Sequence, residues 1–553
     1  MEETRIGVFV CDCGSNIAGF LDVPDVVAYA RTLPNVVFAK ENLYSCSETG
    51  ISEIKNGIKE NSLTRVVVAS CTPRTHEPTF RSACDEAGLN PFYFEMVNIR
   101  EHCSWVHMVD RERATNKAKD LVRIGIAKAA LLEAQESIVA NVNKRVLVIG
   151  GGVAGLTASE SFSRRGFEVV LIEKEEKLGG RLNDLHMLYP HNIKASHVLE
   201  QKIRNATSSP LIKIYTSSVI KSVKGYVGNY EVSVEAGGKD LDVTCGVIVV
   251  ASGASVLEPR GLYNYDSHNV ITQLELEKRL QREEVNAGNI AMIQCVGART
   301  KERNYCSKIC CMTAIKNAII IKEENPKTNI FILYEDIQCY GLEGEALLRK
   351  AKEAGVRFVN YDPAEPPVVG EGSVKVYHKV LRREMALPYD LLVLSTPMIA
   401  REDAKDLSKL LRVPTDESGF FLEAHVKLRP LDFATDGIYL CGSAHWPADV
   451  RESISQALGA VARASVHLTR GFVKVDPIVS TLADEDLCVG CGLCAALCPY
   501  GAIEIVETPK GKKASMISVA CKGCGVCGST CYRRAIKMNH FSNEQMSAQI
   551  AAL

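Results

Sequence analysis

The chain has 553 residues, enough for about three or four domains that each bury a core. Its 65 lysines and arginines balance 66 aspartates and glutamates, so no excess of positive charge is available to bind nucleic acid or an anionic membrane surface. No apolar run reaches the roughly 18 to 20 residues that span a bilayer, and the start, MEETRIGVFVC, is acidic where a signal peptide is basic. We therefore expect a cytoplasmic chain with neither nucleic acid nor a membrane as partner.

The 21 cysteines call for an explanation other than disulfide bonds. Disulfides stabilise small secreted domains, whereas this chain is large and shows no export signal. Thiolates that bind metal clusters are the alternative, and the spacing of the cysteines indicates where such clusters lie.

Four regions follow one another along the chain. Residues 1–138 contain the β-rich runs IGVFV, NVVFA, RVVVAS and PFYFEMV between helix-like stretches, which predicts a small α/β domain. Residues 139–470 open with a strand and a glycine-rich turn and close with the helical pattern SISQALGAVARASVHLTR, which predicts a second α/β unit. Residues 471–483 are a predicted linker, and residues 484–553 contain a cysteine-rich repeat.

Five cysteines of the N-terminal region follow predicted strands or lie in the loops beyond them. In a parallel sheet such positions converge on one edge. Four of the five are therefore candidate ligands of a [4Fe-4S] cluster, the alternative being ordinary loop cysteines, while Cys84 in a helical stretch is predicted to pack in the core. The five candidates are Cys11, Cys13, Cys46, Cys71 and Cys103.

A dinucleotide-binding motif opens the second unit. Gly150, Gly152 and Gly155 form GxGxxG between an apolar strand and a helix, and Glu173 ends the next strand, where an acid binds a ribose hydroxyl. Glycines permit a tight turn, so that a pyrophosphate can lie on the helix N-terminus. This motif alone does not distinguish FAD from NAD.

Later segments resemble flavoproteins of the thioredoxin-reductase-like type, which have two dinucleotide-binding domains. The resemblance lies in GGRL at 179–182, in VIVVASGA at 247–254 and in DGIYLCGSAH at 436–445, although Ser443 stands where an aspartate usually binds the flavin ribityl chain. It implies FAD as the cofactor. The expected FAD-binding residues are Gly150, Gly152, Val153, Ala154, Gly155, Glu173, Lys174, Gly180, Arg181, Ala251, Ser252, Gly253, Gly442 and Ser443.

The middle of this unit departs from those flavoproteins. Where they carry a second GxGxxG for a nicotinamide, the strand NIAMIQC runs into cysteines, so direct use of NAD(P)H is not expected. Four thiols within seventeen residues, in a loop that leads into a helix, predict a further [4Fe-4S] cluster in place of buried or reactive thiols. They are Cys295, Cys306, Cys310 and Cys311.

The C-terminal region repeats the spacing C-x2-C-x2-C-x3-C, in CVGCGLCAALCP and CKGCGVCGSTCY. In this spacing three thiolates bind one cubane and the fourth binds its partner, as in a bacterial two-cluster ferredoxin of the α+β class. Zinc ribbons would show two separated CxxC pairs instead. The predicted sets are Cys488, Cys491, Cys494 and Cys531 for one cluster and Cys521, Cys524, Cys527 and Cys498 for the other, which gives four clusters in the whole chain.

The chain resembles the HdrA family of heterodisulfide reductase subunits across most of its length. The segments that carry the resemblance are CDCG at 11–14, VASCTPRTHEPTFR at 68–81, NIREHCSWVH at 98–107, GGGVAGLTA at 150–158 and QCVGARTKERNYCSKICC at 294–311. It implies an oxidoreductase subunit that performs electron bifurcation or confurcation at FAD. It also implies a catalytic role for Lys316 beside the flavin ring, where a cation stabilises the reduced flavin, with Glu275 as its partner.

The same resemblance implies the partners. They are subunits of the B and C type, a hydrogenase, formate dehydrogenase or NADH dehydrogenase as donor, and ferredoxin, with a homodimer inside the larger complex. Some family members insert a further ferredoxin module before the middle cysteines, but residues 200–290 contain only Cys245, which indicates the short form. A stand-alone NAD(P)H-dependent iron–sulfur flavoprotein and a relay scaffold that does not bifurcate remain as alternatives.

Overall fold

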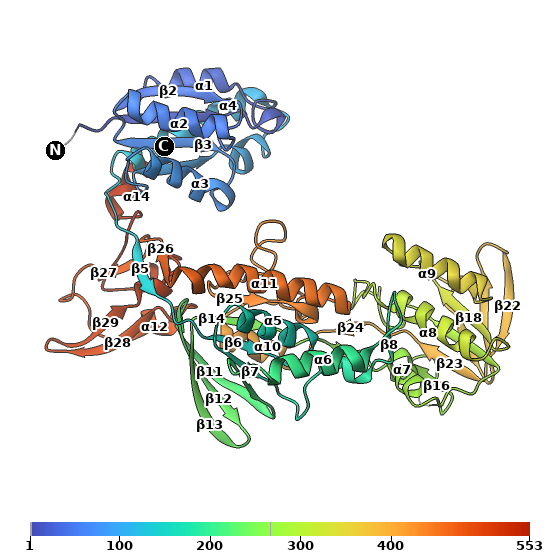
Figure 1. Cartoon of the computed structure of the whole chain (residues 1–553). Coiled ribbons are helices and arrows are strands. Elements are labelled where there is room, and N and C mark those ends of the chain that lie inside the picture. The colour runs from blue at the N-terminus through green and yellow to red at the C-terminus, as the bar shows by residue number, and fades with distance from the viewer. Residues whose placement is uncertain (1–2, 266) are drawn as a thin grey trace. The chain divides into compact units, whose positions relative to one another are not determined.

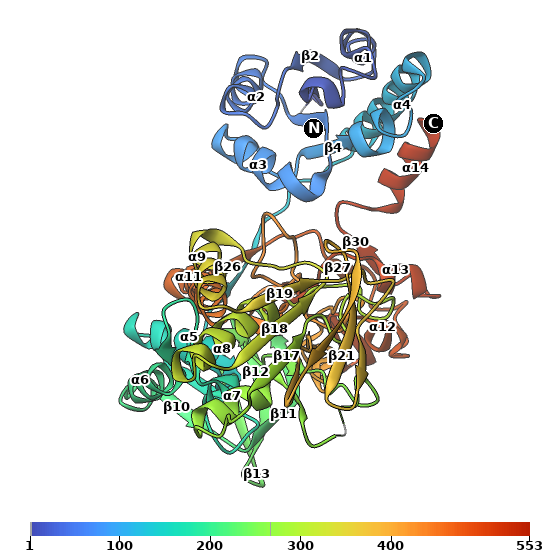
Figure 2. The same ribbon diagram turned by 90° about the vertical axis from the view of Figure 1, so that its right-hand side faces the viewer.

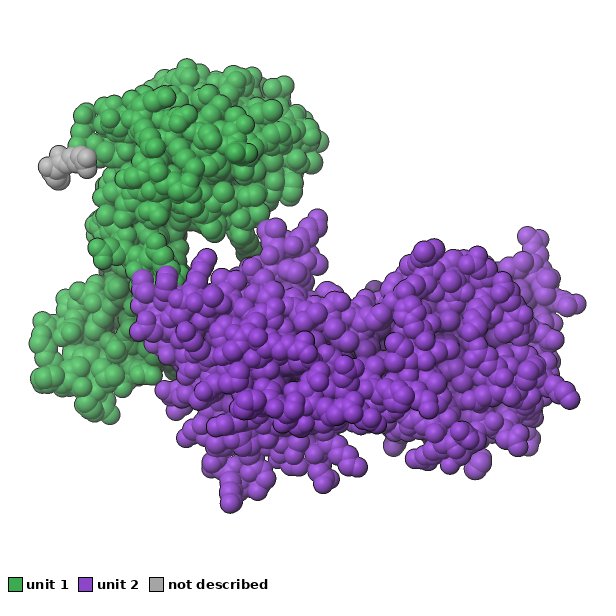
Figure 3. Space-filling model, in the orientation of Figure 1, with its two compact units in different colours: residues 1–138, 474–553 green, residues 139–473 purple. Residues whose placement is uncertain are grey.

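A computed structural model describes residues 3–265 and 267–553. It divides the chain into two compact units (Figure 3). One unit consists of Met1–Ile138 together with Lys474–Leu553, and the other of Val139–Val473. The N-terminal and C-terminal regions thus belong to the same unit although the flavoprotein-like region separates them in sequence.

The N-terminal region forms a parallel sheet between two layers of helices (Figures 1 and 2). All four predicted strands are present, since runs of valine suit strands that are buried on both faces. In spatial order they are β2 (Val36–Asn42), β1 (Ile6–Cys11), β3 (Arg65–Ser70) and β4 (Phe94–Asn98). The carboxyl ends of all four strands therefore lie at one edge.

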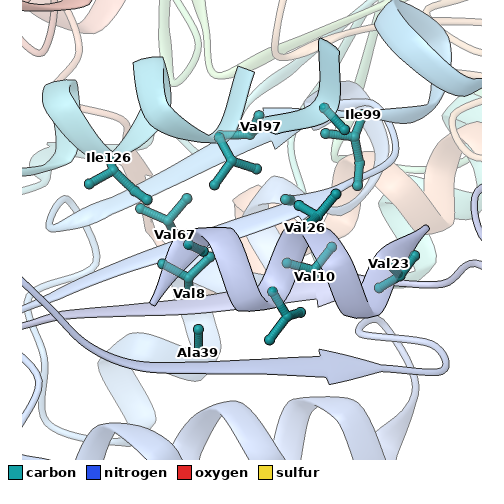
Figure 4. Close-up of a cluster of buried hydrophobic side chains, with 14 of the residues drawn as sticks. Val8, Val10, Val23, Val26, Ala39, Val67, Val97, Ile99 and Ile126 are labelled. Atoms are coloured by element: carbon teal, nitrogen blue, oxygen red, sulfur yellow. The ribbon is translucent and has the colours of Figure 1, made fainter. Parts of the chain in front are cut away.

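Alternation along β1 divides the core between the two layers. Val8 and Val10 pack with one pair of helices (Figure 4), and Phe9 packs with the other pair on the opposite face. A side-chain oxygen caps the N-terminus of each of these helices. The first pair is α1 (Val23–Ala30) and α4 (Arg111–Ala129), and the second is α2 (Glu48–Glu60) and α3 (Pro73–Glu86).

The cysteine-rich repeat forms two short helices and two antiparallel strand pairs. Residues 471–483, predicted to be a linker, are not irregular throughout, because they contain β26 (Phe472–Val475) and β27 (Ser480–Leu482). β27 pairs with β30 (Ile536–Met538), so it belongs to the sheet of the cysteine-rich module. The other elements are α12 (Leu493–Leu497), α13 (Val526–Thr530), β28 (Ile503–Thr508) and β29 (Gly511–Met516).

The last helix, α14 (Asn543–Ala551), leaves this module and packs on α4 of the N-terminal region (Figure 2). Gln545 donates a hydrogen bond to the Leu131 carbonyl at 3.0 Å. His540, which precedes this helix, and Lys128 of α4 both contact the carboxylate of Glu95, whose side chain is 14% exposed. No motif or periodicity in the sequence indicates this packing.

The second unit contains two parallel sheets. The first is the sheet that follows from the GxGxxG motif, and α5 (Val153–Arg164) and α11 (Val450–Arg470) pack against each other beside it. Its strands in order are β10 (Ile212–Tyr215), β7 (Val169–Ile172), β6 (Val146–Ile149), β14 (Val247–Val250) and β25 (Ile438–Leu440). An antiparallel sheet of β11 (Ser218–Tyr226), β12 (Asn229–Ala236) and β13 (Lys239–Cys245) packs on it.

The second parallel sheet has the same kind of strand–helix alternation. Isoleucines of α8 (Cys310–Glu324) are buried with residues of α7 (Gln273–Gln281) and α9 (Gly341–Glu353) in one cluster. The strands in order are β16 (Val270–Thr272), β23 (Leu391–Leu394), β17 (Asn289–Ile293), β18 (Asn329–Tyr334) and β19 (Arg357–Asn360). The three-stranded sheet β20 (Val368–Gly370), β21 (Ser373–His378) and β22 (Arg383–Pro388) accompanies it.

Candidate flavin and iron–sulfur sites

Two of the three motif glycines in the loop between β6 and α5 have no room for a side chain. A Cβ at Gly150, whose φ is 107°, would lie 2.4 Å from the Ala251 carbonyl oxygen, and one at Gly155 would lie 1.8 Å from the Gly150 oxygen. Gly152 caps α5, and a Cβ there would meet no described atom within 4 Å, so this glycine faces open space. The N–H groups of the first turn of α5 are therefore accessible to a pyrophosphate.

Glu173 is fixed to this loop from the next strand. Its buried carboxylate accepts the N–H of Gly151 at 2.6 Å and the N–H of Glu175 at 2.8 Å. A cavity of about 600 Å³ lies beside it. Its lining includes the predicted residues Gly150, Gly152, Val153, Ala154, Glu173, Lys174, Gly180, Arg181, Ala251, Ser252, Gly253 and Ser443.

The two remaining predicted residues lie behind the lining. Gly155 allows α5 to approach the loop, and a Cβ at Gly442 would come 2.9 Å from the Ala154 Cβ. Burial lowers the pKa of Arg181, and Asp184 offsets this only in part. A partly desolvated guanidinium in a cavity lined by open helix N–H groups fits a diphosphate, which would supply the missing counter-charge.

A second cavity of about 320 Å³ adjoins the first, because Val153, Arg181 and Ser443 line both. Its lining is mostly apolar and includes Leu182, Leu185, Met187, Leu188, Pro190, Val256, Leu274, Ile309 and Ile454. The buried hydroxyl of Tyr189 on this lining has no hydrogen-bond partner among the described residues. An apolar slot with an unpaired hydroxyl fits the isoalloxazine ring of a flavin, whose edge offers hydrogen-bonding atoms.

Lys316 lies in the wall of this second cavity. Its side chain is 2% exposed, forms an ion pair with Glu277 and donates a hydrogen bond to the Met187 carbonyl at 3.0 Å. Burial lowers the pKa of Lys316, and the charge of Glu277 acts in the opposite direction. The site thus contains a buried cation whose counter-ion is already in place.

The prediction that Glu275 is the partner of Lys316 is wrong, because Lys316 pairs with Glu277. Glu275 is the third residue of α7 and completes its capping box: its carboxylate accepts the Thr272 N–H at 2.6 Å and the Thr272 hydroxyl at 2.8 Å. Glu277 lies two residues further, on the face of α7 that is buried against α8. Position on the helix, rather than residue type, decides which carboxylate meets the lysine.

The middle cysteines occupy the loop that would otherwise carry the second glycine motif. Cys295 follows β17 in the left-handed region with φ 60°, and Cys310 begins α8. Burial raises the pKa of Cys295 to about 12, with the nearby Glu335 carboxylate and the thiols of Cys311 and Cys306 adding to the effect. The four predicted thiols are thus brought together, and Cys310 also lines the second cavity, the one that fits the isoalloxazine ring.

The N-terminal thiols gather at the carboxyl edge of their sheet. The pKa of Cys71 is raised to about 11, chiefly by burial; the Arg100 guanidinium acts to lower it, and the thiols of Cys13, Cys11 and Cys46 act to raise it. Cys11 accepts the N–H of Ser45 on its sulfur at 3.3 Å. Four of the five candidates therefore share one site.

Cys103 is the fifth candidate, and the structure does not place it with the other four, so it is not a ligand of this site. It is fully buried in the core between β1, α1 and α4, and its thiol donates to the Ala114 carbonyl at 3.0 Å. The π-helical turn Arg100–Ser104 after β4 carries this side chain, which packs towards α4. Cys84 is buried in the other core cluster, as predicted.

The C-terminal cysteines form two groups that match the predicted sets. A cavity of about 30 Å³ is lined by Cys488, Cys491, Cys494 and Cys531. The thiols of Cys521 and Cys498 both raise the pKa of Cys527, after the larger effect of burial, and Cys524 lies with Cys498 and Cys521 beside Tyr500. Gly490 and Gly523, at equivalent positions of the repeat, both have φ 65°.

Backbone N–H groups point at several of these sulfurs. Ala514 donates to Cys488 at 3.5 Å, Ala502 to Cys498 at 3.3 Å and Gly523 to Cys521 at 3.5 Å. Such bonds stabilise thiolates that carry the charge of an iron–sulfur cluster. Within residues 3–265 and 267–553, no three His, Cys, Asp or Glu side chains converge on a single metal ion, whereas the thiolates of a cubane each bind a different iron.

Some residues of these sites escaped the sequence analysis. Asp403 joins Lys174 at 2.8 Å and Arg401 at 3.0 Å beside the first cavity. Although burial acts against it, the bonds from Arg401 and Lys174 lower the pKa of Asp403 to about 2. The thiol of Cys339 lies near Cys311 and adds to the rise in its pKa. No motif marks these residues, because they reach the sites from distant segments.

Comparison with known proteins defines the class of the chain. Residues 144–464 match the pyridine nucleotide-disulphide oxidoreductase family, and residues 482–504 match the 4Fe-4S binding domain. The chain is therefore an α/β flavoprotein of the disulphide oxidoreductase fold joined to a C-terminal ferredoxin domain, as the sequence predicted. No helix among the described residues is long and apolar enough to cross a bilayer.

Full-length relatives define the family. An iron–sulfur subunit of the CoB–CoM heterodisulfide reductase of Methanopyrus kandleri is 40% identical, covering 99% of this chain and 98% of the relative. The corresponding subunit of the H(2):CoB-CoM heterodisulfide,ferredoxin reductase of Methanothermobacter marburgensis is 36% identical, covering 100% and 98%. The chain belongs to the HdrA family of heterodisulfide reductase subunits and is an oxidoreductase subunit.

The first alignment extends over 646 positions against the 553 residues of this chain, which agrees with the short form. Among solved structures, thioredoxin reductase of T. acidophilum is similar with a TM-score of 0.42 at 17% identity, covering 59% of this chain and 98% of that one.

Proposed function

We propose that the chain binds one FAD and four [4Fe-4S] clusters and splits or merges electron pairs at the flavin. The observation that carries this proposal is Cys310, which belongs to the middle thiol group and also lines the cavity that fits the flavin ring. Bound FAD supplies a centre that exchanges two electrons with a donor and single electrons with iron–sulfur clusters. A cluster ligand in the wall of its cavity gives a short path for single electrons.

Lys316 supports the flavin half of the proposal. A cation in a dry, mostly apolar cavity stabilises negative charge on a reduced ring far more than it would in water. Glu277 and the Met187 carbonyl hold the ammonium group in place, so it does not need to reorganise when charge appears. We assign Lys316 as the catalytic residue, with Glu277 in the role that sequence analysis gave to Glu275.

The remaining thiol groups provide the entry and exit of electrons. The cysteines of the N-terminal sheet edge and of the ferredoxin module form separate groups in the first unit. The names of relatives include H(2), formate and ferredoxin as reaction partners of their complexes. We propose subunits of the B and C type, a hydrogenase or a formate or NADH dehydrogenase, and ferredoxin as partners, with a homodimer in the complex.

The first experiment is the content of flavin, iron and acid-labile sulfide in anaerobically purified protein. One FAD and about sixteen irons per chain, four for each cubane, support the proposal. About eight irons would confine clusters to the ferredoxin module and reject the other two. A titration of the flavin then distinguishes bifurcation, which requires the second electron to leave at a lower potential than the first, from a simple relay.

The alternative function, a stand-alone NAD(P)H-dependent enzyme, is tested by adding the nucleotide to the purified chain. It requires a nicotinamide site in the second parallel sheet, where the loop from β17 to α8 carries the cysteines in place of a glycine motif. NADH or NADPH added to the purified chain should therefore leave the flavin spectrum oxidised. Rapid bleaching by either nucleotide would reverse this assignment.

A further inference from the structure

Arg100 stands at the edge where the N-terminal thiols gather, and none of the roles assigned above uses it. It begins the turn Arg100–Ser104 directly after β4. The Asn98 side-chain oxygen accepts the N–H of Arg100 at 3.2 Å and that of Glu101 at 3.0 Å, which fixes the direction of the turn. The arginine is thus held by its backbone before its side chain makes any contact.

Three groups surround the guanidinium. Nη1 lies 3.7 Å from the Cys13 sulfur, Nη2 lies 2.7 Å from the Glu101 carboxylate, and the central carbon lies 4.8 Å from the centre of the Trp105 ring. The side chain is 20% exposed, so its charge is only partly screened by water. This geometry directs an N–H group at one of the four gathered sulfurs.

We propose that Arg100 is a positioning residue that sets the reduction potential of the N-terminal [4Fe-4S] cluster. The inference rests on the proposed function, since it requires Cys11, Cys13, Cys46 and Cys71 to hold that cluster. Reduction adds one electron to the cluster and its thiolates, so a cation and an N–H···S bond stabilise the reduced form more than the oxidised form. Arg100 therefore raises the potential.

Glu101 opposes this effect. Its carboxylate lies beside the guanidinium, and its second oxygen, Oε2, is buried without a hydrogen-bond partner among the described residues. The pair places a positive and a negative charge at different distances from the sulfurs, with the arginine in contact with Cys13. Removal of each charge in turn should consequently shift the potential in opposite directions.

The test is a redox titration of the full-length protein followed by EPR, in which the N-terminal signal is identified by its loss in the Cys71→Ser chain. Arg100→Gln should reduce the ratio of reduced to oxidised cluster at the wild-type midpoint about tenfold, the size expected for one charge-assisted hydrogen bond. For a one-electron couple this is a shift of about 59 mV to lower potential. Arg100→Lys should restore part of it.

Glu101→Gln should shift the midpoint upwards, and Arg113→Gln should leave it unchanged. Arg113 is the matched control, an exposed arginine of the same region that also pairs with an acid, Asp110, at 3.2 Å. If Arg100 only supports the turn, both Arg100→Gln and Glu101→Gln will loosen it and shift the midpoint in the same direction or not at all, which overturns the inference.

Iron content separates this outcome from failure of the proposed function. Wild-type protein with about twelve irons and no signal sensitive to Cys71→Ser lacks the N-terminal cluster, which rejects both the cluster and the role of Arg100. If the wild-type protein shows the signal but the midpoint is unchanged in both Arg100→Gln and Glu101→Gln, only the role of Arg100 is rejected and the cluster stands. If Arg100→Gln loses the iron of this cluster, Glu101→Gln provides the test. An upward shift of its midpoint supports the proposal, and an unchanged or lower midpoint overturns it.

Discussion

At the scale of single residues, the buried pair of Lys316 and Glu277 determines the charge in the wall of the second cavity. Their side chains are 2% and 1% exposed, so neither charge could remain there without the other. Glu277 also accepts the His186 N–H at 2.9 Å, which links α7 to the strand-rich segment that lines the cavity. The pair therefore serves both the stability of the second unit and the electrostatics of its cavity.

Glu277→Gln should leave Lys316 buried beside a neutral amide. We expect a loss of about 3 kcal/mol in the free energy of unfolding of the second unit, as for other buried pairs that lose one partner. The pKa of Lys316, which burial already lowers, should decrease further. Chemical denaturation of the flavin-loaded protein, followed by flavin fluorescence, measures the change.

The control for this prediction is Glu275→Gln, two residues away on the same helix. A glutamine can still complete the capping box at this position, so the variant should lose less than about 1 kcal/mol. Equal losses in the two variants would contradict the structural pairing and favour the partner first predicted from the sequence.

At the scale of elements, residues 540–551, which include α14, return from the ferredoxin module and pack on the N-terminal region. Lys128 lies 2.8 Å and His540 lies 3.3 Å from the Glu95 carboxylate, and the Lys128 ammonium also lies 4.0 Å from the centre of the Phe541 ring. We call residues 540–551 the clasp. Its attachment depends on one largely buried carboxylate, that of Glu95, at the centre of a polar cluster.

The attachment should depend on pH through Glu95. Burial alone would raise the pKa of Glu95, but the hydrogen bond from His540 and the charge of Lys128 outweigh it and lower the pKa. The folded carboxylate thus binds its proton less readily than the unfolded one, so its contribution is complete above the unfolded pKa of about 4.3 and is lost as the pH falls through the lower folded value. Glu95→Gln removes this contribution.

Hydrogen exchange of the clasp, corrected for the intrinsic effect of pH on exchange, measures the prediction. At pH 7, Glu95→Gln should increase the opening constant of residues 543–551 about a hundredfold, or about 3 kcal/mol. The difference from wild type should shrink as the pH falls below about 4. Glu60→Gln, an exposed acid at the end of α2, should behave as wild type at every pH, and a difference that persists at low pH would contradict the assignment to Glu95.

At the scale of the whole molecule, contiguous patterns were predictable and tertiary choices were not. The four strands of the N-terminal region, the strand, glycine loop and helix that open the second region, and the ferredoxin repeat follow from residues close in sequence, and the structure contains each of them. Glu277, Asp403 and the inward turn of Cys103 depend on which face of an element meets another, which spacing alone does not determine. The clasp depends on a contact between segments about 400 residues apart.

The count of clusters is the prediction that involves the entire chain. Three thiol groups that are separate in sequence predict four cubanes, two of them in the ferredoxin module. Cys71→Ser, Cys310→Ser and Cys494→Ser each remove one thiolate from a different group. Each variant should lose about four irons per chain, because a serine at one corner leaves an incomplete ligand set, and the three losses should be independent.

Two further cysteines test whether these losses are specific. Cys103 and Cys84 are fully buried in the two core clusters of the N-terminal region and are not among the four gathered thiols, so Cys103→Ser and Cys84→Ser should keep every iron although each replaces a buried thiol. Iron and sulfide analysis of the five purified variants decides the question. If Cys103→Ser loses four irons and Cys71→Ser loses none, the N-terminal cluster uses a ligand set other than Cys11, Cys13, Cys46 and Cys71, and the electrostatic role of Arg100 would need a different sulfur.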